Sequence, residues 1–271
     1  MTERPRLFVT LEGYAVEGGF DRGSEPMTCY SPTIALGRHS GPGAADDLWH
    51  DYELVLDVVP SLGFDGVRLS VEWARIEPRG GEINESALRR YAEVVRHARS
   101  LGLLVTIAVI DSAWPSWLGL EAWLLPWVAP HVQAHARRMV DTFGEDATGF
   151  VLFAQPQELV TRGFLLGSAP PWRKSALKDA GFANAQIARL SQSLFDDEIV
   201  GPRLVRRSAV ISLDAALPDL VAARSASDVD ELYVRSLLRG SGPTSVSVGL
   251  LSTRAGEWRV SADEELLSAL R

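Results

Sequence analysis

The sequence predicts an α/β protein built on a parallel sheet, because short apolar runs alternate about six times with segments of helical spacing. No Gly-x-Gly-x-x-Gly follows a predicted strand, and no Gly-Lys-Ser/Thr phosphate loop occurs. These observations favour a TIM-type (β/α) barrel over a nucleotide-binding sheet. A complete barrel of this type has about eight units. We therefore expect one domain over residues 1–271, with a barrel that is incomplete or irregularly closed.

The predicted strands are short runs rich in apolar residues. The clearest is Leu103–Ile110, whose continuous apolar character is typical of a parallel strand that is buried on both faces. Counting along the chain, the six predicted strands cover residues 6–11, 66–71, 103–110, 150–153, 208–213 and 245–251.

The segments between these strands show helical periodicity. The first places Leu48, Tyr52, Val55, Val58 and Val59 on one side of a helix over 47–62, and the glycine at 63 is suited to end it. Residues 13–42 are rich in Gly, Ser and Pro and predict a long loop. Further helices are predicted over residues 84–101, 130–143, 183–199, 228–238 and 262–270.

The overall charge excludes some functions. The net charge is −8 and the isoelectric point is near 5.2, which disfavours nucleic acid and anionic membranes as partners. Cys29 is the single cysteine, so no intrachain disulfide is expected. No signal-like opening and no apolar run of about 18 residues occurs, so we expect a cytoplasmic protein without a membrane span. Only Lys174 and Lys178 are lysines, which indicates a GC-rich bacterial gene.

Several motifs resemble the family 1 glycoside hydrolases, which are β-glucosidase-like enzymes on a (β/α)8 barrel. The longest, over residues 63–78, reads G-F-D-G-V-R-L-S-V-E-W-A-R-I-E-P and is similar to the family's L-G-x-x-x-Y-R-F-S-I-S-W-x-R-I-x-P. Shorter matches follow the family's order at residues 14–18, 83–91, 114–118, 143–144, 153–156 and 163–171. The resemblance is clear over residues 7–172 and faint beyond residue 208. It implies the barrel fold and a site for a glycoside-like ligand.

The chain departs from this family at the positions that carry its chemistry. The resemblance places the family's acid/base glutamate at Gln155, and an amide cannot act as a general acid or base. A sugar-binding glutamine aligns with Ala15, and a sugar-binding histidine aligns with Asp111 in one of several alignments of that loop. The T-E-N-G motif of the family nucleophile is absent from these 271 residues, as if the chain stopped before it. Ordinary retaining hydrolysis, which needs two carboxyl groups, is therefore not expected.

Other carboxyl groups fall near the predicted carboxyl ends of the strands, where barrel enzymes hold their chemistry. Arg68, Ser70 and Glu72 alternate along one strand and share a face. Alternatively, Glu72 or Asp111 only neutralises Arg68, which would otherwise be a buried unpaired charge. The candidate catalytic residues are Glu72, Asp111 and Glu158, and the candidate ligand-binding residues are Arg68, Gln155, Trp114 and Tyr14.

The remaining features carry weaker predictions. Six tryptophans between residues 49 and 127 could include a stacking platform for a sugar, although such residues more often pack in a core. His131 and His135 have the spacing of two metal ligands on a helix, but an exposed pair is the preferred interpretation. Glu12 and Glu17 flank the first loop, and we expect a structural role for Glu17. We predict no metal and no cofactor.

Three functions remain open at this point. The first is a repurposed barrel that binds a small polar or glycoside-like molecule, with non-hydrolytic chemistry such as isomerisation or elimination. The second is a non-catalytic binding or interaction protein, a pseudoenzyme whose open sheet edges would attract another chain or a second copy of itself. The third is a glycosidase that uses displaced carboxylates. Whether the protein is an enzyme is left open, because a fold does not determine a function.

Overall fold

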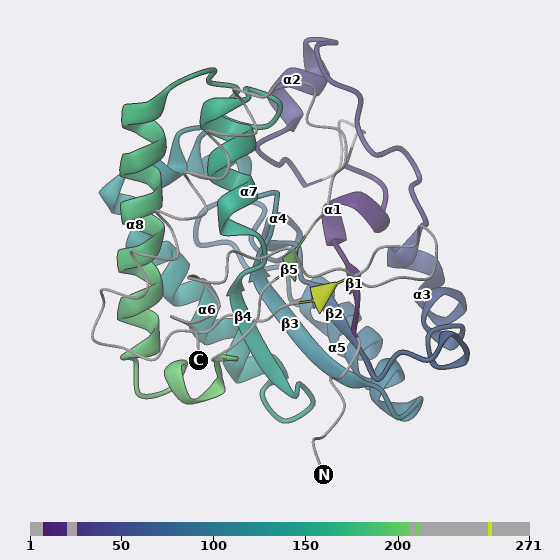
Figure 1. The fold of residues 1–271 in the computed structure, drawn as a ribbon. Coiled ribbons are helices and arrows are strands. Elements are labelled where there is room, and N and C mark those ends of the chain that lie inside the picture. Colours follow the sequence, from purple (N-terminus) through teal and green to yellow (C-terminus); the bar gives the residue numbers. More distant parts are fainter. Residues whose placement is uncertain (1–7, 21–25, 206–209, 212–248, 251–271) are drawn as a thin grey trace.

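The computed structural model describes residues 8–20, 26–205, 210–211 and 249–250. Its main sheet has four parallel strands in the order β1-β2-β3-β4, and they run side by side in Figure 1. The strands are β1 (Phe8–Leu11), β2 (Gly66–Ser70), β3 (Leu104–Ile110) and β4 (Gly149–Phe153). Their bounds lie within two residues of those predicted, and the parallel α/β architecture is confirmed.

The chain continues the sheet pattern beyond β4. Leu204 forms a parallel bridge with Phe150, and the N–H of Val205 donates to the Phe150 carbonyl at 2.8 Å. Two short strands, β5 (Val210–Ile211) and β6 (Gly249–Leu250), pair with each other in parallel, within the strands predicted there. The helices predicted over residues 228–238 and 262–270 lie outside the described residues.

Four longer helices surround the sheet, and short helices lie near the carboxyl ends of its strands (Figure 1). The longer ones are α3 (Leu48–Asp57), α5 (Glu85–Ser100), α6 (Ala129–Phe143) and α8 (Leu177–Phe195). The short ones are α1 (Gly13–Val16), α2 (Ser31–Ala35), α4 (Trp73–Ile76) and α7 (Pro156–Val160), which continues into the π-helix η5 (Thr161–Leu165). The 3-10 turns are η1 (Pro60–Leu62), η2 (Ser116–Leu118), η3 (Ala122–Leu124), η4 (Pro126–Val128) and η6 (Gly201–Arg203).

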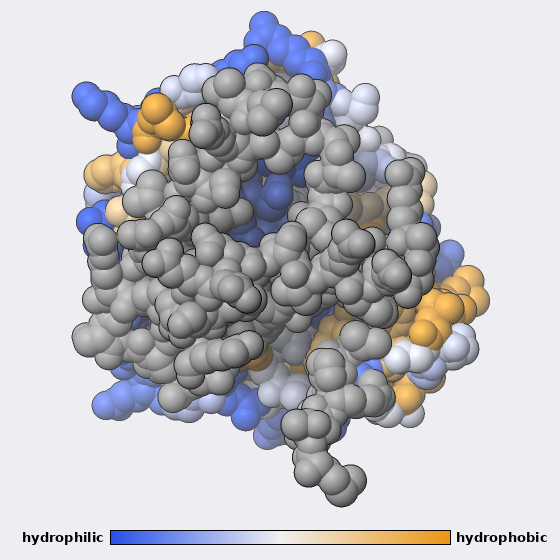
Figure 2. All heavy atoms as spheres, in the orientation of Figure 1, coloured by the Kyte–Doolittle hydropathy of each residue, from blue (hydrophilic) through white to orange (hydrophobic). Residues whose placement is uncertain are grey.

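The first helical segments differ from the prediction. Residues 13–42, expected to form a loop, contain α1 and α2. Helix α3 ends at Asp57, and Val58 at its carboxyl end is 51% exposed instead of lying on the apolar face. Leu56 takes the inward position and is fully buried. Exposed Leu54, Val58 and Leu62 give the hydrophobic surface seen over α3 in Figure 2.

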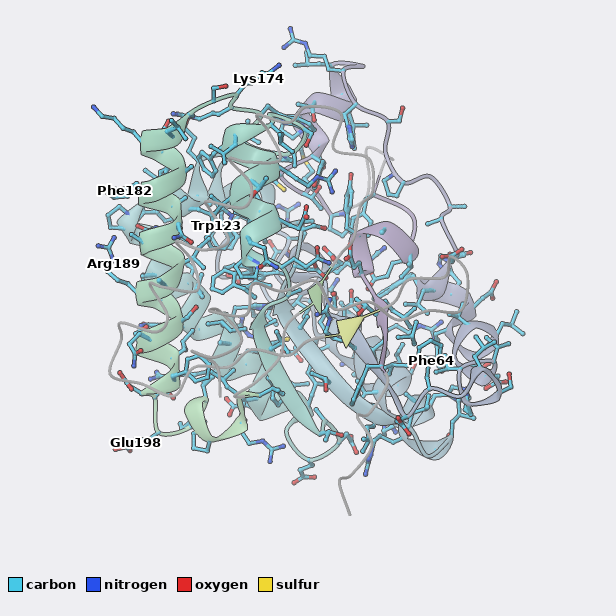
Figure 3. All side chains as sticks on the ribbon, in the orientation of Figure 1. Phe64, Trp123, Lys174, Phe182, Arg189 and Glu198 are labelled. Carbon is cyan, nitrogen blue, oxygen red and sulfur yellow. The ribbon has the colours of Figure 1, made fainter. Side chains whose placement is uncertain are left out.

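Helix α8 begins six residues before its predicted start. Its first residue, Leu177, is 68% exposed, and no side chain caps its amino end. Figure 3 shows Phe182 and Arg189 pointing away from the molecule on the outer side of α8, whereas Trp123 lies on the inner side. In the first turn Ala180 is the one buried residue, and a single small side chain is a weak signal for sequence periodicity.

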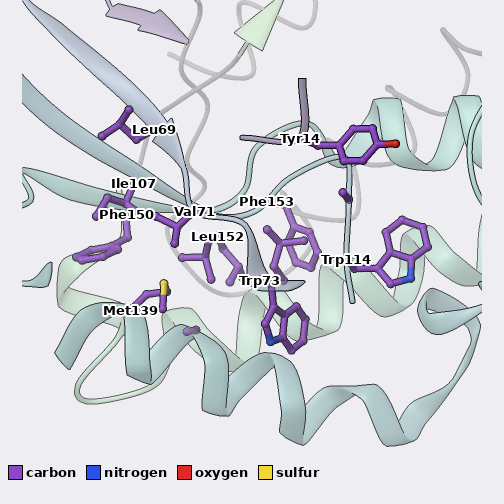
Figure 4. Close-up of a cluster of buried hydrophobic side chains, with 14 of the residues drawn as sticks. Tyr14, Leu69, Val71, Trp73, Ile107, Trp114, Met139, Phe150, Leu152 and Phe153 are labelled. Carbon is purple, nitrogen blue, oxygen red and sulfur yellow. The ribbon is translucent and has the colours of Figure 1, made fainter. Parts of the chain in front are cut away.

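One contiguous apolar core joins the sheet to the helices. Figure 4 shows Leu69, Ile107 and Phe150, from three neighbouring strands, at one end of this cluster. Tyr14 and Trp114 lie at the other end. Burying such side chains stabilises the fold by about 1.5–3 kcal/mol each, and the core fixes the strands whose ends carry the polar residues described next.

Candidate active site

Polar side chains gather where the four strands end. Glu12 directly follows β1, Arg68 and Ser70 lie on β2, Asp111 follows β3, and Gln155 comes two residues after β4. Because parallel strands place their carboxyl ends at one edge of the sheet, these residues share one site. Figure 2 shows hydrophilic surface between the positions that α7 and α1 have in Figure 1. We call these five residues the mouth site.

Asp111 is fixed from two sides. The hydroxyl of Ser70 donates to its Oδ2, and the N–H of Ser112 donates to Oδ1 at 2.8 Å. Asp111 is 8% exposed, and this burial raises the pKa of its carboxyl, while the Ser70 hydrogen bond and the Arg68 charge lower it. Asp111 thus lies directly after β3, at the carboxyl end of that strand.

A hydrogen bond joins the two outer strands of the described sheet. The Gln155 amide Nε2 donates to Glu12 Oε1 at 2.6 Å, across 143 residues of sequence. In a flat sheet with a strand spacing of about 4.8 Å, the first and fourth strands would be about 14 Å apart. The sheet therefore curls at its carboxyl edge, as a barrel wall does, and brings β1 and β4 within reach of one another.

Glu12 is held in an environment that favours its protonated form. Burial, and after it the nearby charge of Asp111, raise the pKa of its carboxyl to about 7 on balance. The cations Arg68 and Arg162 and the Gln155 hydrogen bond act in the opposite direction. Both protonation states of the Glu12 carboxyl are therefore populated near neutral pH.

Arg68 lies beneath these carboxyl groups and is 4% exposed. Burial lowers the pKa of its guanidinium, and the charges of Asp111 and Glu12 raise it. Among the described residues, no group accepts a hydrogen bond from its Nε or Nη2. A buried cation with free donors is costly, so this guanidinium is suited to bind an oxygen-rich ligand. The carboxyl groups whose charges act on Arg68 are those of Asp111 and Glu12. The alternative hypothesis, that Asp111 only neutralises the charge of Arg68, is therefore also supported.

Glu72 lies apart from the opening, under helix α1. Its Oε1 accepts a hydrogen bond from the Tyr14 N–H at 2.8 Å, and the side chain is 2% exposed. A Cβ at Gly13 would come within 2.6 Å of Glu72 Cγ, so only glycine fits above it. Burial raises the pKa of Glu72 well above its ordinary value, and the charges of Glu17 and Asp111 add to this. These contacts support a packing role for Glu72 more than contact with a ligand.

A second buried network supports α1 from below. The Arg75 guanidinium donates to Glu17 Oε2 at 2.7 Å and to the Gly18 carbonyl at 2.7 Å. The same guanidinium lies between the rings of Phe20 and Trp49, 4.3 Å from each ring centroid. The Tyr91 hydroxyl donates to Glu17 Oε1 at 2.8 Å. These contacts agree with the structural role expected for Glu17.

The remaining predicted site residues stand further from this cluster. Glu158 lies in α7, half-buried, and no hydrogen bond in the described part of the chain links it to the mouth site. Trp114 is 1% exposed and its indole N–H donates to the Gly119 carbonyl at 2.9 Å, so its ring packs in the core. The Tyr14 ring stacks on Tyr30 with centroids 4.5 Å apart.

The weaker candidates take structural positions. His135 is fully buried, not exposed as expected, and stacks on Trp73 with its Nε2 3.2 Å from the Val109 carbonyl. Burial lowers the pKa of His135 to about 3. Burial raises the pKa of the Cys29 thiol, which disfavours a nucleophilic role. Within the described ranges, no group of three or more His, Cys, Asp or Glu is arranged to hold a metal ion.

Sequence reasoning placed Glu12 at the first loop but did not include it in the site. The missing information was the curvature of the sheet, which brings β1 opposite β4. A weak signal existed: Glu12 ends the first apolar run, just as Asp111 ends the third.

No helix in the described part of the chain is long and apolar enough to cross a membrane.

Curated relatives of this chain are β-glucosidases. Coniferin beta-glucosidase of Pinus contorta is 28% identical over 170 residues, which cover 60% of this chain and 33% of the relative. Beta-glucosidase 12 of Oryza sativa subsp. japonica is 25% identical over 274 residues, covering 90% of this chain and 52% of the relative. The chain thus spans between a third and about half of the length of these relatives.

Solved structures share the fold. The virulence factor SghA from Agrobacterium tumefaciens superimposes with a TM-score of 0.71 at 21% identity, covering 88% of this chain and 56% of SghA. Aphid myrosinase gives a TM-score of 0.67 at 14% identity, covering 84% of this chain and 52% of that protein. The fold is therefore the TIM-type barrel of these enzymes, although its closure is not defined by the described strands.

The sequence model of glycosyl hydrolase family 1 matches residues 9–265. This match confirms the resemblance seen in the motifs. It also extends that resemblance well beyond residue 172, where the motifs visible in the sequence fade. The chain belongs to glycosyl hydrolase family 1.

Proposed function

We propose that this chain binds a small polar or glycoside-like molecule at the mouth site and does not perform the ordinary retaining hydrolysis of its family. One observation carries the proposal. At the position of the family's acid/base glutamate the chain has Gln155, whose amide is engaged with Glu12 at 2.6 Å. The polar groups around it remain directed to the strand ends, where barrel proteins bind ligands.

Arg68 adds the second line of support. Its Nε and Nη2 have no acceptor among the described residues, and its charge faces two carboxyl groups. A ligand with several hydroxyl groups would accept from this guanidinium and donate to Asp111. Chemistry at such a site would be non-hydrolytic, for example an isomerisation or elimination driven by proton transfer.

Calorimetric titration of glucose, cellobiose and salicin tests this proposal. Salicin is included because SghA, a structural neighbour, has been solved with it as a substrate analogue. We expect saturable binding of at least one of the three, weakened about tenfold or more in Gln155→Leu because the amide that orders the site is lost. The matched control is Gln157→Leu, a neighbouring half-buried amide in α7, which should bind as the wild type does.

A hydrolysis assay separates the proposal from a glycosidase with displaced carboxylates. The alternative is favoured by the presence of Glu12 and Asp111 at the mouth site, since hydrolysis needs two carboxyl groups. We expect 4-nitrophenyl β-D-glucoside to release nitrophenol no faster with the protein than in buffer between pH 5 and 8. Release that is lost in both Glu12→Gln and Asp111→Asn would replace our proposal by the alternative. Absence of binding to all three sugars would refute it outright.

A further inference from the structure

Glu12 occupies a special place in the mouth site. It directly follows β1, and its Oε1 accepts the hydrogen bond that the Gln155 amide donates. The second carboxyl oxygen, Oε2, is the one left to carry and exchange a proton. The carboxyl of Glu12 and the amide of Gln155 therefore form one unit that spans the strand ends from β1 to β4.

Charged groups from the neighbouring elements surround this unit. Asp111 faces it from the end of β3, Arg68 from β2, and Arg162 from η5. Burial and the Asp111 charge favour the protonated carboxyl, whereas the two arginines favour the carboxylate. Asp111 is engaged by Ser70 and Ser112, and Glu72 is enclosed beneath α1. Glu72 Oε2 also has no hydrogen-bond partner among the described residues, but Glu72 is 2% exposed. Glu12 is half-buried, and no described residue donates a hydrogen bond to its Oε2, so this oxygen is the one placed to meet a ligand.

We propose that Glu12 supplies the exchangeable proton of the mouth site, with Gln155 as its positioning residue. The acid–base group would thus have moved from the end of the fourth strand to the end of the first. This inference rests on the proposed function, because the proton needs a ligand oxygen to receive it. It names the group that acts and the class of ligand, an uncharged molecule with an ether or hydroxyl oxygen.

The neutral acid donates a hydrogen bond from Glu12 Oε2 to the ligand oxygen, and no covalent bond breaks when the ligand binds. The acid exchanges its proton with water, and the carboxylate that remains is stabilised by Arg68 and by the Gln155 amide. Removal of the amide donor should therefore favour the neutral form of Glu12 and shift its pKa upward.

The pH dependence of salicin binding tests the role of Glu12. Only the neutral acid can donate to a glycosidic oxygen, so we expect wild-type affinity to be about tenfold weaker at pH 8 than at pH 6. Glu12→Gln keeps a neutral donor at every pH and should bind equally well at both. Unchanged wild-type affinity between pH 6 and 8, or the same tenfold loss in Glu12→Gln, would overturn the inference.

A carbon-13 NMR titration of the carboxyl groups provides a second readout that needs no ligand. The signal that disappears in Glu12→Gln should titrate near pH 7 in the wild type and higher in Gln155→Leu. A Glu12 signal that titrates near its ordinary pKa of 4.5 would refute the inference, whatever the protein binds. If salicin fails to bind while Glu12 still titrates near pH 7, salicin is excluded as a ligand and the placement of the acid–base group stands.

Discussion

Glu12 and Gln155 differ in how far their roles could be predicted from the sequence. Gln155 could be identified from sequence because its strand and the proline after it match a family motif. Glu12 could not, because nothing in its local sequence indicates which strand it faces. Its partner lies 143 residues away, and its raised pKa depends on burial and on charges from three other elements. Such a residue is recognised only when the sheet is seen to curl.

Glu72 gives a test at the scale of one side chain. The protonated acid and a glutamine are nearly isosteric and equally neutral, and burial holds the pKa of Glu72 well above its ordinary value. We expect Glu72→Gln to change the free energy of unfolding by less than about 1 kcal/mol at pH 7. Glu72→Ala removes the acceptor of the Tyr14 N–H and should cost about 1–3 kcal/mol. Urea denaturation at pH 7 measures both values.

If Glu72→Gln and Glu72→Ala lowered the free energy of unfolding by equal, large amounts, the Glu72 carboxyl would be charged in the folded protein. In that case Glu72 would return to the list of candidate catalytic carboxyls. A small loss for glutamine and a larger loss for alanine would support its packing role under α1.

Secondary-structure elements were predicted best where the local signal was strong. The continuous apolar run of β3 and the capped, amphipathic α5 were located to within one residue. The predicted start of α8 was too late, because its first turn is mostly exposed and no side chain caps its amino end. On α3, periodicity assigned Val58 to the core, but the helix ends before it and Leu56 packs inward instead.

The amino end of α5 offers a test at this scale. The Asn84 side chain accepts a hydrogen bond from the Ala87 N–H at 3.1 Å, which satisfies one free donor of the first turn. Asn84→Ala should lower the free energy of unfolding by about 1 kcal/mol. Asn84→Asp keeps an acceptor and should remain near the wild type, as measured by thermal or urea denaturation. A loss of equal size in both variants would contradict the capping role.

The contact between the ends of β1 and β4 is a feature of the whole sheet and of no single element. Four parallel strands were foreseen, and so was a polar edge at their carboxyl ends. The contact between the first and fourth strands was not foreseen, because it depends on the curvature of the sheet. That contact determines which of the candidate carboxyls face one another. It gathers Glu12, Asp111 and Arg68 into one site and leaves Glu158 without a hydrogen bond to it among the described residues.

The pH dependence of global stability tests the central claim, that the mouth site holds Glu12 as a proton-bearing acid. Burial raises its pKa from 4.5 to about 7 in the folded protein, so the folded state binds more protons than the unfolded state between these values. The stabilisation from this group is therefore complete below about pH 4.5 and is lost as the pH rises through about 7. Burial also raises the pKa of Asp111 and Glu72, which acts in the same direction.

The decisive measurement is the difference in unfolding free energy between the wild type and Glu12→Gln, determined by urea denaturation from pH 4 to pH 8. In this difference, the pH-dependent contributions of the titratable groups that both proteins share cancel. We predict that the wild type loses up to about 3 kcal/mol relative to the variant across this range, with most of the loss between pH 4.5 and 7. A difference that stays constant with pH would show that Glu12 titrates alike in both states and would contradict the account.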